Sequence, residues 1–267
     1  MKRVLGWLPL LGYVFFALFL FVPFLWGLRT SLADQFDVHF IPTHISLIHY
    51  QTILSRPEFY SYLSNSILVA LVSIAGVVVI AVPAGYALAR IKFRGQKWGG
   101  VLLILPLLPP VAILVPLVAY FQKLGLYNTL AGVIIANVVF NLPLAVWMLR
   151  NFIHGCPYEI EEAARVDGCS RLGLMVRIVM PLMAPGVVAV SLFVFINSWN
   201  NYLFAFALTS SQSLRVLPQA ILAFLGIWGT YWGGLCAAGL LVLIPPVVLF
   251  LFFQKWFILG MFGQQLK

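Results

Sequence analysis

A charged, helix-forming segment interrupts an apolar chain at Glu159-Ile-Glu-Glu-Ala-Ala-Arg-Val-Asp-Gly168 and continues through Ile178 and Pro181. Four of the seven acidic residues of the chain lie in it: Glu159, Glu161, Glu162 and Asp167. Charge is costly to bury, so such a segment must be solvated by water or by a protein partner. We therefore expect an ordered polar element between membrane spans, suited to docking a soluble protein.

The rest of the chain has the composition of a membrane protein. Hydrophobic residues make up 63% and charged residues 9%, and the mean hydropathy is +1.03. Soluble domains contain about 45–50% apolar and about 25% charged residues. A bilayer core about 30 Å thick requires roughly 20 apolar residues for each helical span. Six segments meet this requirement: residues 7–28, 63–89, 99–121, 130–149, 186–207 and 236–256.

The apolar segments are continuous and lack the two-residue alternation of lipid-facing strands, which favours helices over a β-barrel. We therefore predict an all-α integral membrane protein, a bundle of six transmembrane helices forming one domain over residues 1–267. Pro106, Pro109, Pro110 and Pro116 predict a bent third helix. The longest inner connection is the loop 150–185, which contains the charged segment.

The distribution of basic residues predicts the orientation in the membrane. With the amino terminus inside, twelve of the 16 Lys and Arg residues lie on the inner side. The positive-inside rule then places both termini and the 150–185 loop in the cytoplasm. The net charge of +9 does not indicate a nucleic-acid partner, because the basic residues are scattered over short loops. The basic segment 90–97 suits contact with anionic membrane lipid.

Several functional classes lack their motifs in this sequence. Without a GxxxxGK[ST] phosphate-binding loop, we expect no cofactor and no ATP on this chain. Three cysteines without a CxxC pair, and histidines at positions 39, 44 and 49 that share no helix face, argue against a metal site. No Ser/His/Asp set indicates catalysis, so we expect that the protein is not an enzyme.

The charged segment predicts two short helices joined by a tight turn. Pro157 suits the first helical turn, and the glutamates after it favour the positive end of the helix dipole. Gly168 suits a helix end with positive φ, and Ser170 can cap a second helix. This second helix has apolar residues at helical spacing: Leu172, Met175, Val176 and Val179.

The exposed side of the first helix suits a protein partner. The small side chains of Ala163 and Ala164 allow close approach, while Glu162 and Asp167 can accept charge-assisted hydrogen bonds. Gly168 would fix the angle between the helices. The alternative is a hairpin on the membrane surface without a partner, and the residues alone leave both open.

The sequence resembles the EAA signature of bacterial ABC-importer permease subunits, in its carbohydrate-importer version. Cys169 and Met180 depart from the usual alanine and leucine but remain apolar. Further stretches in the same order resemble the maltose-transporter-like second-permease branch. The matching stretches are Gly85-Tyr-Ala-Leu-Ala-Arg90, Gly125-Leu-Tyr-Asn-Thr129, Asn141-Leu-Pro-Leu-Ala-Val-Trp-Met-Leu-Arg150, Glu162-Ala-Ala-Arg-Val-Asp-Gly168, Ile178-Val-Met-Pro-Leu182 and Trp199-Asn-Asn-Tyr-Leu-Phe204.

This resemblance implies the permease subunit of an ATP-driven carbohydrate importer in the bacterial inner membrane. The implied partners are a sister permease in a heterodimer, two ABC ATPase subunits that bind ATP and Mg, and an extracytoplasmic solute-binding protein. The charged segment would be the coupling helix, seated in a groove of the ATPase. The implied coupling residues are Glu162, Ala163, Ala164, Asp167, Gly168, Ile178 and Pro181.

Polar residues inside the spans are candidates for a substrate pathway, because they usually face a bundle interior. Asparagine amides suit hydroxyl-rich ligands, since they both donate and accept hydrogen bonds. The candidates are Asn137, Asn141, Asn197, Trp199 and Asn200. Helix-to-helix packing is the alternative role.

Other activities remain as alternatives to carbohydrate import. The same importer could carry a polyol, a glycerol phosphodiester or another small polar solute. A membrane enzyme or an independent carrier is disfavoured, because no charged residue lies deep in a span.

Overall fold

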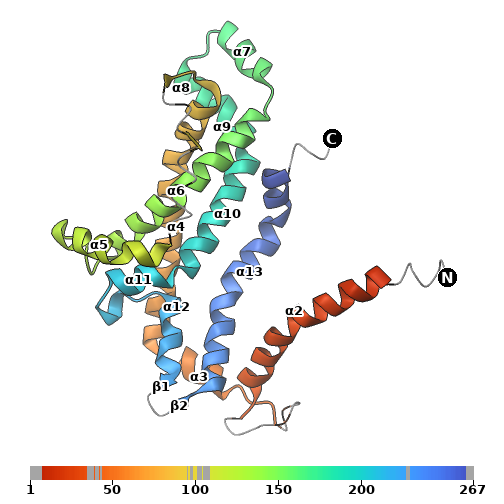
Figure 1. The fold of residues 1–267 in the computed structure, drawn as a ribbon, viewed down its shortest axis with the longest axis vertical. Helices are drawn as coiled ribbons and strands as arrows, with labels where there is room; N and C mark the ends of the chain where they lie inside the picture. Colours follow the sequence, from red (N-terminus) through yellow and green to blue (C-terminus); the bar gives the residue numbers. More distant parts are fainter. Residues whose placement is uncertain are drawn as a thin grey trace. The chain divides into compact units, whose positions relative to one another are not determined.

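The structure is a computed structural model that describes residues 8–34, 39, 42, 44–94, 96, 99–100, 104, 109–226 and 229–262. Regular structure in these ranges is almost entirely helical (Figure 1). Two-residue strands β1 (Leu225–Gly226) and β2 (Gly229–Thr230) form one short antiparallel pair. The predicted all-α membrane fold is confirmed.

Long apolar helices correspond to four of the six predicted spans. Within the described residues, four helices are long and apolar enough to cross a membrane, or five if one bent pair counts as a span. The bent pair joins Leu172–Leu182 to Ala184–Asn200 at an angle of 74°. The four long helices are α2 (Leu8–Leu32), α4 (Pro57–Arg90), α6 (Leu130–His154) and α13 (Trp232–Phe262).

The other two predicted spans take different forms. For the third, the described residues contain only the 14-residue helix α5 (Pro110–Lys123), while most of 101–108 lies outside them. The fifth is divided into α10 (Ala184–Asn200) and α11 (Tyr202–Leu208). The division falls at Asn201, whose side-chain oxygen accepts a hydrogen bond from the Phe204 amide and thereby starts a new helix. The count of six spans stays a prediction.

The chain packs as two compact units. The first comprises Met1–Tyr60 and Gln219–Ile244, and the second comprises Ser61–Pro218 and Pro245–Lys267. The boundaries fall inside α4, inside α13 and inside the short helix α12 (Leu217–Ala220). That the whole chain acts as one domain stays a prediction.

A buried histidine organises the first unit. His49 lies on α3 (Ile48–Leu54), with Nε2 2.9 Å from the Ala33 carbonyl and Nδ1 2.9 Å from the Tyr231 hydroxyl. Gly233 lies against the imidazole, where a Cβ atom would clash. This unit also contains the 3-10 helix η4 (Ile221–Phe224). No group of three metal-binding side chains occurs in the described part of the chain.

The second unit holds the main core, in which α4 and α10 pack with α6. Buried aliphatic side chains from all three fill it, including Val77, Leu149 and Val194. Gly85 allows close approach, since a Cβ there would lie 3.1 Å from the Arg150 amide nitrogen. One end of the unit carries α7 (Tyr158–Val166), α8 (Arg171–Leu174), the π-helical segment η2 (Met175–Val179) and α9 (Met180–Leu182). The other end carries α5, α11 and η3 (Gln212–Leu214) (Figure 1).

Candidate functional site

The predicted helix stop at Gly168 is confirmed by the backbone. Gly168 has a φ of 78°, and its amide donates to the Arg165 carbonyl at 3.1 Å. The Cys169 amide donates to the Ala164 carbonyl at 3.0 Å. These two bonds form a Schellman turn, which satisfies the last carbonyls of a helix and favours glycine at the left-handed position.

The second helix begins as predicted. Ser170 caps it by accepting a hydrogen bond from the Gly173 amide at 3.1 Å. Of the four apolar residues at helical spacing, Leu172 and Val176 are exposed, whereas Met175 packs against the core. Leu174, which is not in that set, is buried together with Val179. Their five-residue separation matches the i→i+5 repeat of the π-helical segment between them, which the 3.6-residue pattern did not anticipate.

The predicted coupling residues divide into an exposed set and an inward set. The exposed residues are Glu162, Ala163, Asp167, Gly168 and Pro181. Ala164 is buried in the core with Leu174, and Ile178 is half-buried against the same core. An open groove of about 730 Å³ follows the turn. Its lining combines charged and apolar side chains: Asp167, Gly168, Cys169, Ser170, Leu172, Gly173, Val176 and Arg177.

A buried carboxylate that was not among the predicted site residues anchors α7. Glu161 is only 2% exposed, although it lies beside the exposed Glu162. Arg90 Nε donates to Glu161 Oε1 at 2.8 Å, and the Tyr86 hydroxyl donates to Oε2 at 2.9 Å. Both carboxylate oxygens are therefore bound by the last turn of α4. We call Tyr86, Arg90 and Glu161 the Glu161 cluster.

Neighbouring groups complete the surroundings of this cluster. Arg90 Nη2 donates to the Cys156 carbonyl at 2.8 Å, and its guanidinium lies over the Tyr158 ring, 5.2 Å from the centroid. Arg165 Nη2 lies 3.8 Å from Glu161 Oε2. A hydrogen bond to the Tyr158 hydroxyl raises the pKa of Arg165. Burial raises the pKa of the Cys156 thiol.

The energetics make each member of the cluster depend on the others. Arg90 is 10% exposed and Glu161 2%, so water solvates neither side chain well. Removing one partner of a buried ion pair typically costs about 3–5 kcal/mol, because a charge is left uncompensated. The sequence offers one local signal, the i,i+4 spacing of Glu161 and Arg165. The pairing with Arg90 joins residues 71 positions apart and has no local signal.

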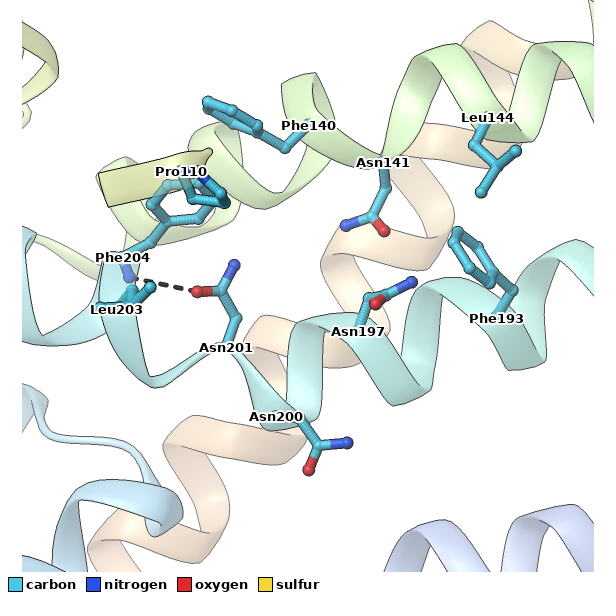
Figure 2. Close-up of a pocket in the computed structure, with 10 residues that line it drawn as sticks. All are labelled: Pro110, Phe140, Asn141, Leu144, Phe193, Asn197, Asn200, Asn201, Leu203 and Phe204. Carbon is cyan, nitrogen blue, oxygen red and sulfur yellow. Dashed lines mark hydrogen bonds between the residues drawn. The ribbon is translucent and has the colours of Figure 1, made fainter. Parts of the chain in front are cut away.

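A second candidate site is a cavity of about 350 Å³ between α6, α10 and α11. Figure 2 shows Asn141, Asn197 and Asn201 around this space, with the Asn200 amide directed away from Asn141. None of the lining residues is charged. They are Pro110, Phe140, Asn141, Leu144, Phe193, Asn197, Asn200, Asn201, Leu203 and Phe204.

The predicted pathway residues divide between this cavity and the core. Asn141, Asn197 and Asn200 line the cavity, whereas Asn137 and Trp199 do not. Asn137 is fully buried, donates to the Val133 carbonyl and accepts from Asn201 Nδ2 at 2.9 Å. Trp199 is buried and stacks on Phe195. Asn137 and Trp199 therefore pack in the core of this structure, and Asn201 joins the cavity lining; a substrate pathway through these residues stays a prediction.

Comparisons with known proteins give a consistent result. Residues 81–262 match the family described as binding-protein-dependent transport system inner membrane component. The chain is 32% identical to the trehalose/maltose transport system permease protein MalG of Thermococcus litoralis, over 100% of this chain and 98% of that protein. It is 33% identical to the sulfoquinovosyl glycerol transport system permease protein SmoH of Agrobacterium fabrum, over 92% and 88%.

A solved structure supports the fold. The chain is similar to one in the crystal structure of a bacterial ABC transporter involved in the import of the acidic polysaccharide alginate. The TM-score is 0.82, with 96% of this chain and 97% of that chain covered. The sequence identity is 21%, so the likeness concerns the fold alone.

Proposed function

Because the chain belongs to the inner membrane components of binding-protein-dependent transport systems, we propose that it is the permease subunit of an ATP-driven carbohydrate importer. It is a multi-pass membrane protein whose partner outside the membrane is a solute-binding protein. Its sister permease, in a heterodimer, and two ABC ATPase subunits complete the transporter. ATP and Mg bind to those ATPase subunits, and the amino and carboxyl termini face the cytoplasm with α7.

The observation that carries the proposal is the two-sided construction of α7. Glu162 and Asp167 are exposed beside the open groove at the Gly168 turn. On the other side of the same helix, Glu161 and Ala164 are buried in the bundle. An ATPase that grips the exposed side therefore acts directly on the transmembrane helices.

The uncharged cavity favours a neutral, hydroxyl-rich solute. The amides of Asn141 and Asn197 can donate and accept hydrogen bonds, and the rings of Phe140 and Phe193 offer apolar faces. These groups match the alternation of hydroxyls and C–H faces on a sugar. A polyol would use the same amides, whereas an anionic glycerol phosphodiester would find no cationic side chain in this lining.

The coupling role is tested with charge reversal at two exposed glutamates. The change Glu162→Lys should abolish ATP-driven uptake of the sugar that the co-purifying binding protein retains, because it reverses charge on the docking face. Glu58→Lys is the matched control, since Glu58 is exposed at the start of α4, outside the 150–185 loop. Membrane insertion should be equal for both.

Two outcomes would overturn the proposal. One is full uptake by the Glu162→Lys transporter. The other is uptake by vesicles that contain this chain without any ATPase subunit.

A further inference from the structure

We infer that Glu161 is a positioning residue that transmits movement of the docked α7 to α4, an assignment that rests on the proposed function. Two neighbouring glutamates thereby have opposite tasks. Glu162 faces the partner, whereas Glu161 faces the bundle and is too deeply buried to reach an ATPase without breaking its own bonds.

The first step concerns how α7 is attached. It has nine residues, and its N-cap residue Pro157 makes no side-chain capping bond. Isolated helices of this length are marginal, so tertiary contacts must hold it. Only Glu161 and Ala164 of this helix are buried. Alanine offers a single methyl group, so the orientation of α7 depends mainly on the carboxylate.

The second step concerns what the carboxylate grips. Tyr86 and Arg90 are four residues apart, so they lie on one face of the last turn of α4. They bind the two carboxylate oxygens separately, at 2.9 and 2.8 Å. Two directional bonds to different atoms fix rotation as well as distance, which an apolar contact would not do.

The third step concerns the segment that leads into α7. Arg90 also donates to the carbonyl of Cys156, in the short link between α6 and α7. One guanidinium therefore ties the end of α4 to this link and to α7 itself. A displacement of α7 must either carry the end of α4 with it or break several charge-assisted bonds to the buried carboxylate.

The experiment measures the distance between α7 and α4 in the assembled transporter. Spin labels are placed on Ile160→Cys and Val79→Cys, both exposed, in a chain whose native cysteines are serine. The intact cluster should give one narrow distance distribution that is unchanged by ATP, Mg and vanadate. The change Glu161→Gln should broaden this distribution and make it depend on nucleotide, while the ATPase subunits remain bound.

The controls separate a positioning role from general stability. Glu159→Gln, the same charge change on the exposed side of α7, should leave the distribution narrow. Tyr86→Phe removes one hydrogen bond but keeps the ion pair, so it should broaden the distance distribution less than Glu161→Gln. If Glu161→Gln fails to insert into the membrane, Tyr86→Phe provides the test. A double variant with Arg90→Gln should be no broader than the broader single variant, because the residues act as a unit.

The outcomes also separate the inference from the proposed function. Narrow, nucleotide-independent distances in both Glu161→Gln and Tyr86→Phe would overturn the inference. If no ATPase subunit co-purifies with the unsubstituted chain, the proposed function fails, and the distances without nucleotide still test the cluster.

Discussion

Gly125 and Gly168 end two helices with the same backbone turn. Gly125 has a φ of 70° and Gly168 a φ of 78°. After α5, the Leu126 amide donates to the Phe121 carbonyl at 2.9 Å, just as Cys169 donates to Ala164 after α7. Both are Schellman turns, and a Cβ at either glycine would meet open space.

The side chains around the two turns differ in kind. Near Gly125, the uncharged side chain of Asn128 makes hydrogen bonds to the segment that follows α11. Its Oδ1 accepts from the amides of Ser210 and Ser211, and its Nδ2 donates to the Ser211 hydroxyl. Near Gly168, exposed carboxylates lie above the buried Glu161 cluster. The same turn is therefore found beside neutral hydrogen bonds of Asn128 near Gly125 and beside charged residues near Gly168.

The largest effect should follow from removing the buried cation. Arg90→Met leaves the buried Glu161 without its closest cation, so the free energy of unfolding should fall by up to about 3–5 kcal/mol. Denaturant unfolding of the purified transporter measures this. The exposed Arg94→Met is the control and should change stability by less than about 0.5 kcal/mol. Adding Glu161→Gln to Arg90→Met should restore part of the loss; an equal effect of both arginine changes would refute the cluster's energetic role.

Replacing the glycine by alanine at both turns separates their effects on stability from their effects on ATPase binding. Gly168→Ala and Gly125→Ala each place a side chain in the left-handed region, at a cost of about 1–2 kcal/mol. Thermal unfolding should show similar losses. ATPase retention should fall only for Gly168→Ala, because only that turn borders the groove at which docking is proposed. Equal loss of retention in both variants would make the effect one of stability alone.

Removing the Asn128 side chain should lower stability less than removing the Arg90 cation. Asn128→Gly keeps the positive φ of 57° but removes the amide bonds, which should lower stability by about 1–2 kcal/mol. ATPase retention should be unchanged. A loss as large as that of Arg90→Met would contradict the distinction between the two ends.

The smallest effect is a change in thiol reactivity. Burial raises the pKa of Cys156, so at neutral pH less reactive thiolate is present than for a free thiol. Maleimide labelling of a Cys169→Ser/Cys236→Ser chain should be slow and should accelerate as pH rises towards that pKa. Glu161→Gln should speed labelling by loosening the Arg90 contact to the Cys156 carbonyl; labelling as fast as in the denatured chain would contradict the burial.

Local features of the site could be predicted from the sequence, and long-range ones could not. The Gly168 turn and the Ser170 cap depend on neighbouring residues, so both were predictable. The ion pair between Arg90 and Glu161 depends on how α4 and α7 pack, which no local sequence pattern encodes. Among the asparagines, residue type identified a polar cluster, but the break at Asn201 decided that Asn137 is used in packing while Asn197 lines the cavity.

Because Glu161 and Glu162 face opposite sides of α7, the ATPase subunit could be exchanged without changing the contacts of Glu161. Under the proposed function, the exposed residues of α7 and its turn would contact the ATPase, so changing positions 162, 163 and 167 should redirect the transporter to a foreign ATPase. Such a chimera would keep the buried residues Glu161 and Ala164, and with them the contacts of α7 with the bundle.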